Sequence, residues 1–305
     1  EMGDKEGAFV VLQAAFKEDY ANATTSRELE RIATQTGRWN ELVSDYTQVV
    51  QTIADKKIAA DLWVKIGRWY AEHLNHIDYA IASEKQALAL VPNHKEALAQ
   101  LADAYRKTSR WTDLCDVLAK HAAIEEEPAK RVELHLAMAD LYEGPLNDPG
   151  MAVRSYREAV TADPSCLEAL HALERLHRKA GKWAELIDVL GRKVQVIDDP
   201  DQVITTKHQI AALHEEQMGD PNKSIQTYRE VLVLDSQNAP AMKALERLYE
   251  RTGATDAYLD ILEQQLDVAG SDAERVSIYE RQARTWEDKY RKMDRACEVL
   301  EKILV

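Results

Sequence analysis

The sequence is poor in the residues on which disulfide scaffolds, nucleotide-binding loops and membrane spans depend. Its 305 residues include three cysteines, eleven glycines, eight prolines and two phenylalanines. Three cysteines make no disulfide framework and are compatible with a reducing compartment, which favours a cytoplasmic location. No run of eighteen apolar residues occurs that could cross a bilayer. A net charge of −14 opposes binding to phosphate backbones, so we expect no nucleic-acid partner and no membrane insertion.

Motifs of catalysis, cofactor binding and metal binding are also missing. The sequence has no GxGxxG, P-loop, HExxH, GxSxG or CxxC pattern. His171 and His177 are six residues apart, as are His208 and His214, which places each pair on diverging faces of a helix. We expect His177 and His214 to pack in the core, and a metal site shared by His171 and His208 is the alternative. The sequence predicts a protein that is not an enzyme and holds no metal or cofactor.

The composition that is present is typical of packed amphipathic helices, and it repeats at a fixed interval. The chain is 45% hydrophobic and rich in Ala, Leu, Glu, Arg and Lys. Related segments stand 72 residues apart, as TGRWNELVSDY at 36–46, SRWTDLCDVL at 109–118 and AGKWAELIDVL at 180–190. Self-similarity at a fixed period indicates an array of repeats.

Each 72-residue repeat is expected to hold four helices of about fourteen residues. Apolar residues recur at i, i+3, i+4 and i+7, as in Leu98, Leu101, Ala102 and Tyr105. All eight prolines fall at the predicted joints between helices, where they are tolerated. Short joints make neighbouring helices antiparallel, and the pairs must then stack to bury their apolar faces.

The second half of each repeat resembles a tetratricopeptide repeat. Two halves carry the resemblance, one through Trp63, Ile66, Gly67, Tyr70, Ala80, Ala87 and Pro92, the other through His135, Met138, Ala139, Tyr142, Ala152, Tyr156, Ala159 and Pro164. The resemblance implies an all-α fold, a right-handed superhelical solenoid of antiparallel helix pairs with about seventeen helices.

The first halves depart from the family pattern. Glu30, Glu174 and Glu246 stand where the pattern has a small residue, which only Ala102 supplies. A glutamate is not expected to be buried there, so these pairs are expected to pack at a changed angle or rotation. Cys115 and Cys297 align with apolar positions and Cys166 with a linker, so we expect core and loop positions for them.

The repeat interval also divides the chain. It predicts a last helix of a preceding repeat at 1–22, followed by repeats at 23–94, 95–166, 167–238 and 239–305, so that the sequence is part of a longer array. Apolar faces at the two ends predict possible end-to-end self-association. The alternative is that Phe9, Val10, Leu12 and Phe16 form a cap of their own.

In the resembled family, the first helix of each pair lines the concave face, and this predicts the candidate partner-binding residues. In the first halves they are mostly basic: Arg106, Lys107, His171, Arg175, Arg178, Lys179, Lys243, Arg247 and Arg251. In the second halves the candidates are Asp140, Glu143 and His208, among positions that are mostly acidic.

Two interpretations of this alternation remain open. Neighbouring helices can neutralise one another through exposed ion pairs, which leaves the surface passive. Alternatively, a partner segment with charges in matching order is held in register, with an acidic stretch against the basic helix around Arg175, Arg178 and Lys179. We expect a non-catalytic protein–protein interaction scaffold that binds a protein or peptide along its concave groove. The alternative is a substrate-selecting or regulatory segment of a larger enzyme.

Overall fold

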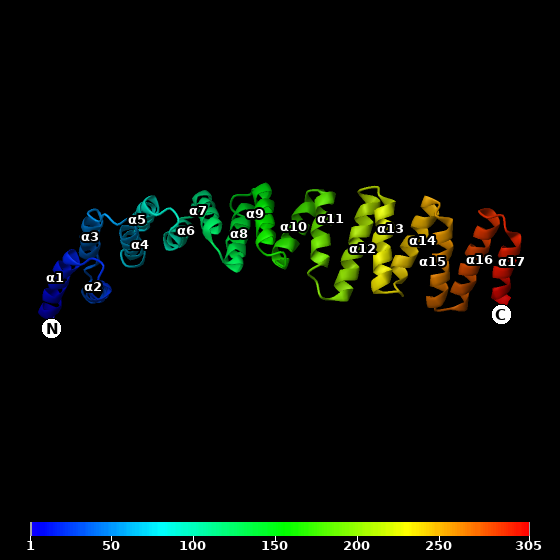
Figure 1. Cartoon of the computed structure of the whole chain (residues 1–305), viewed down its shortest axis with the longest axis horizontal. Coiled ribbons are helices and arrows are strands. Elements are labelled where there is room, and N and C mark those ends of the chain that lie inside the picture. Colours follow the sequence, from blue (N-terminus) through cyan, green and yellow to red (C-terminus); the bar gives the residue numbers. More distant parts are fainter. Residues whose placement is uncertain (1, 305) are drawn as a thin grey trace. The chain divides into compact units, whose positions relative to one another are not determined.

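A computed structural model describes the backbone of residues 2–304 and the side chains of residues 5–303. Residues 1 and 305, which belong to the predicted first and last segments, lie outside this range. Within it the chain forms seventeen α-helices and one terminal 3₁₀ turn, with no β-strand (Figure 1). None of these helices is both long enough and apolar enough to cross a membrane. The prediction of an all-α fold with about seventeen helices is confirmed.

The helices divide between two compact bodies, an N-terminal body up to Asp163 and a C-terminal body from Pro164 onward. The N-terminal body contains α1 (Met2–Glu18), α2 (Ala23–Thr36), α3 (Trp39–Val50), α4 (Lys56–Glu72), α5 (Ile77–Leu90), α6 (Lys95–Lys107), α7 (Trp111–Ile124), α8 (Pro128–Glu143) and α9 (Pro149–Ala162). The C-terminal body contains α10 (Leu167–Lys179), α11 (Trp183–Val194), α12 (Pro200–Glu216), α13 (Pro221–Leu234), α14 (Ala239–Thr252), α15 (Thr255–Val268), α16 (Asp272–Asp288), α17 (Met293–Glu301) and the 3₁₀ turn Lys302–Leu304.

Within each body, helices pack mainly against their neighbours in the chain. The most extensive contacts join α4 to α5 and α8 to α9 in the N-terminal body, and α12 to α13 and α16 to α17 in the C-terminal body (Figure 1). These are the pairs of the second halves. The pairs of the first halves, such as α6 with α7 and α10 with α11, are more loosely joined.

Helix starts keep the 72-residue interval in all four positions of the repeat. The helices begin at residues 23, 95, 167 and 239, at 39, 111, 183 and 255, at 56, 128, 200 and 272, and at 77, 149, 221 and 293. The four prolines Pro128, Pro149, Pro200 and Pro221 occupy the first position of their helices, where the missing amide hydrogen costs nothing. No proline lies in the middle of a described helix.

Two turns in each repeat require a left-handed backbone conformation. The first follows the first helix and is made by Gly37, Ser109, Gly181 and Gly253, with φ of 72°, 54°, 65° and 73°. The second follows the third helix and is made by Asn75, Asn147, Gly219 and Arg291, with φ of 53°, 48°, 64° and 54°. The first set was recognisable from its spacing. The second set was not recognisable, because its position holds asparagine, glycine or arginine in different repeats.

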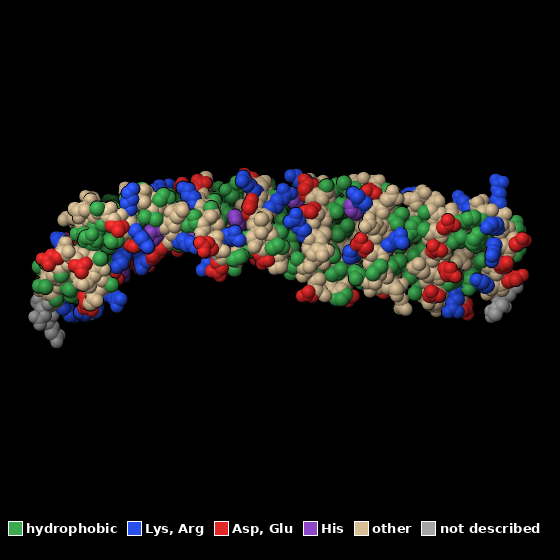
Figure 2. Space-filling model, viewed as in Figure 1, with side chains coloured by type: hydrophobic (Ala, Val, Ile, Leu, Met, Phe, Trp, Pro, Cys, Tyr) green, Lys and Arg blue, Asp and Glu red, His purple; other side chains and the backbone are tan. Residues whose placement is uncertain are grey.

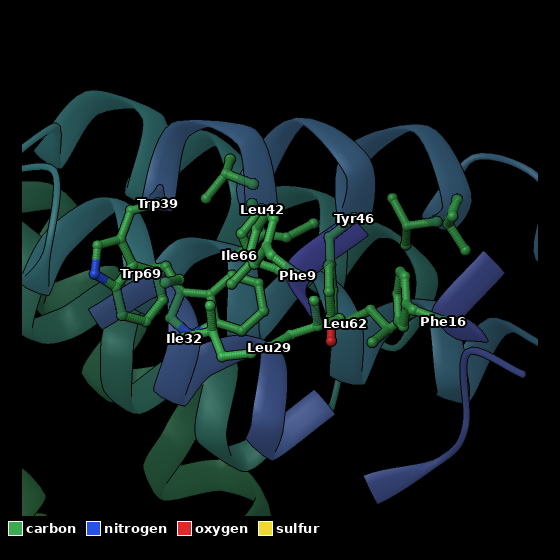
Figure 3. Packing of buried hydrophobic residues seen from close by; sticks show 14 of the residues in the cluster. Phe9, Phe16, Leu29, Ile32, Trp39, Leu42, Tyr46, Leu62, Ile66 and Trp69 are labelled. Carbon is green, nitrogen blue, oxygen red and sulfur yellow. The ribbon is translucent and has the colours of Figure 1, made fainter. Parts of the chain in front are cut away.

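Aromatic side chains join α1 to the helices that follow it (Figure 3). Phe9 and Phe16 of α1 are fully buried, and the Phe16 ring stacks on Tyr46 of α3 with centroids 3.8 Å apart. The Tyr46 hydroxyl donates a hydrogen bond to Ser26 Oγ at 2.8 Å, and burial raises the pKa of Tyr46 to about 12. Val10 remains 57% exposed. Two of the four residues proposed as a cap therefore form part of a continuous core.

The glutamates of the first helices are largely buried, contrary to the expectation from the sequence. The Glu174 side chain is 12% exposed and pairs with Lys193 at 2.9 Å and with Arg178 at 3.0 Å. Glu246 is 15% exposed, pairs with Arg281 and accepts a hydrogen bond from Gln265 at 2.9 Å. The expectation failed because cations and amides from neighbouring helices surround these carboxylates, which makes their burial tolerable.

Glu30 and Ala102 are the residues equivalent to Glu174 and Glu246 in the first two repeats. Glu30 is 35% exposed and lies 3.9 Å from Lys65, which is the equivalent of Arg281 in its own repeat. In the repeat that has Ala102 instead, the equivalent of Lys65 is Ala137. In the repeat of Glu174 the equivalent residue is Gln209, and the cation comes instead from Lys193 of the next helix.

The expected positions of the cysteines are correct for two of the three. Cys115 is buried and Cys166 is half-buried, as expected for core and loop positions, but Cys297 on α17 is exposed. Its neighbour Ala296 turns toward the interior instead.

Candidate partner-binding surface

In the C-terminal body, two predicted binding residues hold one carboxylate of a neighbouring helix. Arg247 and Arg251 of α14 pair with the two oxygens of Glu215 on α12, at 2.7 and 2.9 Å. The Glu215 side chain is only 6% exposed, whereas the arginines are 63% and 51% exposed. A carboxylate with two charge-assisted partners joins the helices firmly. This is the neutralising contact of the passive interpretation.

The predicted binding residues of α10 are exposed. Arg178 pairs with Glu174 and also donates to Gln209 Oε1 of α12 at 3.4 Å. His171, Arg175 and Lys179 are exposed. Lys179 makes no ion pair with any residue that the structure describes. On the opposite face, α10 buries Leu170, Leu173 and His177 among other residues, so the expectation that His177 packs in the core is confirmed.

His208 and Lys243 have different surroundings. His208 is half-buried, with Nε2 3.0 Å from Asn238 Oδ1 and its ring edge-on to Tyr228 at 5.4 Å. Asn238 also caps α14, because the same oxygen accepts a hydrogen bond from the Ala241 amide at 3.0 Å. His208 therefore supports a helix start. Lys243 is exposed and lines a pocket of about 330 Å³ formed by α14, α15 and α16.

In the N-terminal body, the predicted residues are also partly engaged. Arg106 is exposed and pairs with Asp103 on its own helix at 2.8 Å, while Lys107 is exposed. Asp140 is exposed and accepts a hydrogen bond from the Tyr156 hydroxyl at 3.1 Å. The same hydroxyl lies 3.5 Å from Glu143 Oε2. Tyr156 thus holds the two acidic residues of α8 together.

Opposite charges are interspersed on the surface. On the face drawn in Figure 2, basic and acidic side chains stand in small mixed groups and not in a field of one sign. Among the predicted binding residues, Arg106, Arg178, Arg247 and Arg251 each pair with an acidic residue. In the part of the chain that the structure describes, Lys107, Lys179 and Lys243 are the three candidates of the lysine type, and none makes an ion pair.

The prediction missed a pocket of about 110 Å³ that α4, α5 and α6 form in the N-terminal body. Glu84 of α5 lines it and is 1% exposed, and neither of its carboxyl oxygens has a hydrogen-bond partner among the described residues. Burial raises the pKa of Glu84 to about 9, with a further increase from Glu96 and an opposing effect of Arg68. Alignment of the repeats could have revealed it, because Tyr156 and Tyr228 are the equivalent residues.

Comparison with known families finds a tetratricopeptide repeat at two places, residues 97–132 and 169–203. Both segments cover the two helices of a first half and the start of the following helix. They begin 72 residues apart. The sequence had indicated the clearer resemblance in the second halves, whereas these two matches lie in first halves. No curated protein matches the chain.

Several solved structures are similar to this chain at low identity. MamA has 16% identity and a TM-score of 0.34, with 59% of this chain and 94% of that chain covered. YrrB, described as a tetratricopeptide-repeat protein with an unusual peptide-binding site, has 13% identity and a TM-score of 0.30, with coverage of 75% and 94%. The C-terminal part of a repeat protein from Cytophaga hutchinsonii has 15% identity and a TM-score of 0.34, with coverage of 80% and 93%. The chain is thus all-α, with stacked helix pairs in each body, and two of its segments match the tetratricopeptide repeat.

Proposed function

We propose that the chain is a non-catalytic scaffold that binds a segment of a partner protein along its first-half helices, with α10 at the centre of the site. Tetratricopeptide repeats in general are protein-interaction modules, which supports the first part of this proposal. The observation that carries the second part is the exposed surface of α10. After Glu168 in its first turn, this surface consists of His171, Arg175, Arg178 and Lys179.

This basic surface is unusual in a chain of net charge −14. The apolar face of α10 anchors the helix in the core, so its basic residues are presented by a rigid element. The ion pair with Glu174 leaves Arg178 half exposed, and the largely buried Glu174 keeps its second partner, Lys193, when Arg178 turns away. An acidic partner segment can therefore compete for Arg178 at little cost. Charge complementarity of this type sets orientation and specificity.

The test begins with a partner captured by the purified chain, whose binding segment is mapped and then measured with both components pure. We expect Arg175→Glu with Lys179→Glu to weaken binding and to leave folding unchanged, since both positions are exposed. The loss should be largest at low ionic strength, where exposed charges are least screened.

A matched control changes the net charge by the same amount elsewhere. Arg154→Glu with Arg157→Glu reverses two exposed arginines on α9, the second helix of its pair. This control should bind like the parent apart from a small general effect of net charge. If both double variants bind equally well at low ionic strength, α10 is not the binding surface and the passive interpretation of the charges stands.

A further inference from the structure

The pocket around Glu84 has equivalents in the next two repeats, where a tyrosine occupies the position of Glu84; in the last repeat the residue is Leu300. Tyr156 is 4% exposed and Tyr228 is 7% exposed. Each tyrosine accompanies an alanine on the preceding helix, Ala139 or Ala211, where the repeat of Glu84 has Gly67. The pocket formed by α4, α5 and α6 therefore differs from the equivalent places in those two repeats at Gly67 and Glu84, which are in contact with each other.

Gly67 makes room for the carboxyl group. A Cβ atom at this position would overlap with Glu84 Oε1 and would press against the Glu84 carboxyl carbon. The carboxyl group thus lies directly against the α4 backbone. A shorter side chain than tyrosine at position 84 leaves the adjoining pocket of about 110 Å³ open.

The charged groups that face Glu84 come from both helices packed against α5. Helix α4 contributes Arg68 and Glu72, and α6 contributes Glu96, Asp103 and Lys107. Arg68 is already paired with Glu96. With Glu84 protonated, the lining carboxylates Glu72 and Asp103 balance Arg68 and Lys107, so the pocket favours a cation only when Glu84 itself ionises.

We propose that this pocket receives the side chain of a lysine from the partner segment, with its ammonium group hydrogen-bonded to the Glu84 carboxylate. This rests on the proposed function, because it assigns a partner residue to one place on the same scaffold. A buried carboxyl group without a partner is costly, and an ammonium group supplies the donors that it lacks. A pocket of this size suits a flexible unbranched chain better than the wide planar guanidinium of arginine.

Binding of this kind changes the protonation of Glu84. In the free chain Glu84 is protonated at neutral pH, because burial raises its pKa. The bound ammonium group stabilises the carboxylate, so the Glu84 proton leaves to solvent as the lysine enters. Affinity should therefore increase as pH rises from 6 to 8, while the lysine itself remains charged.

The experiment uses a positional-scanning peptide library with the full chain and with two variants. Glu84→Gln keeps the size and removes the charge, and Glu84→Tyr introduces the residue of the next two repeats and fills the pocket. We expect the parent chain to select lysine at one peptide position. Replacement of that lysine by norleucine, which lacks the ammonium group, should weaken binding to the parent about thirty-fold. Both peptides should bind equally to Glu84→Gln.

Calorimetry in buffers of different ionisation enthalpy should show about one proton released per lysine peptide bound at pH 7, and none with Glu84→Gln. Selection of peptides without a preference for lysine would overturn this inference alone and would leave the scaffold function intact. An equal preference for lysine in the parent and in Glu84→Gln would also overturn the inference, because Glu84 would then not recognise the lysine. If the parent selects no peptide at all, both the inference and the proposed function are wrong.

Discussion

The buried carboxyl group of Glu84 should make the chain less stable as pH rises, and Glu84→Gln should remove this dependence. Its pKa is raised from 4.5 to about 9 by burial. A group with a raised folded pKa is bound to its proton in the folded state and loses it on unfolding, so the free energy of unfolding falls with pH between these two values. Below 4.5 both states are protonated and the effect vanishes.

The size of the effect follows from the same shift. Between these two pKa values, each increase of one pH unit lowers the free energy of unfolding by about 1.4 kcal/mol. From 4.5 to pH 7 this amounts to a destabilisation on the order of 3 kcal/mol relative to a neutral side chain of the same size. Glu84 is 1% exposed, so solvent screening reduces this figure little.

The assay is urea denaturation of the parent and of Glu84→Gln, followed by circular dichroism at pH 5, 6, 7 and 8. The difference between the two proteins cancels other titrating groups, and the variant should gain stability over the parent with each step in pH. Glu133→Gln, which changes an exposed glutamate on α8, is the matched control and should show no such trend. A difference between parent and Glu84→Gln that is constant from pH 5 to pH 8 would refute the reasoning.

Two further predictions concern packing and charge. Gly67→Ala should change the stability little, because the Glu84 carboxyl group that it displaces is the end of a flexible side chain beside a pocket, and alanine favours the helix by about 1 kcal/mol. In urea denaturation the same change should stabilise the Glu84→Tyr variant more than it stabilises the parent, because it builds the alanine–tyrosine pair of the next two repeats; equal effects in both backgrounds would contradict the contact. Glu215→Gln should lower stability by about 1 kcal/mol, because it removes the charge that Arg247 and Arg251 share and both arginines are largely exposed; the loss should shrink in 1 M salt, and an unchanged loss would point to packing instead.

Much of the helical layout could be read from local patterns. The prolines at helix starts and the left-handed turn at Gly37 and Gly181 are constraints on single residues or short segments, which act in the same way wherever the segment lies. Because the repeats are 72 residues apart, a helix or turn assigned in one repeat predicts the same element 72 residues later. The turn at Arg291 was missed because its residue type does not signal a left-handed conformation.

The sequence by itself determined the number, order and starts of the helices, since helical periodicity and turn chemistry depend on neighbours a few residues away. Only the tertiary structure decided which charges are buried, paired or left without a partner. Glu174 is buried because Lys193 reaches it from the next helix, and Glu215 is held by two arginines more than thirty residues away. Glu84 has no such partner. The free energy of a buried charge depends on the groups packed around it, and these come from helices whose contact no local pattern encodes.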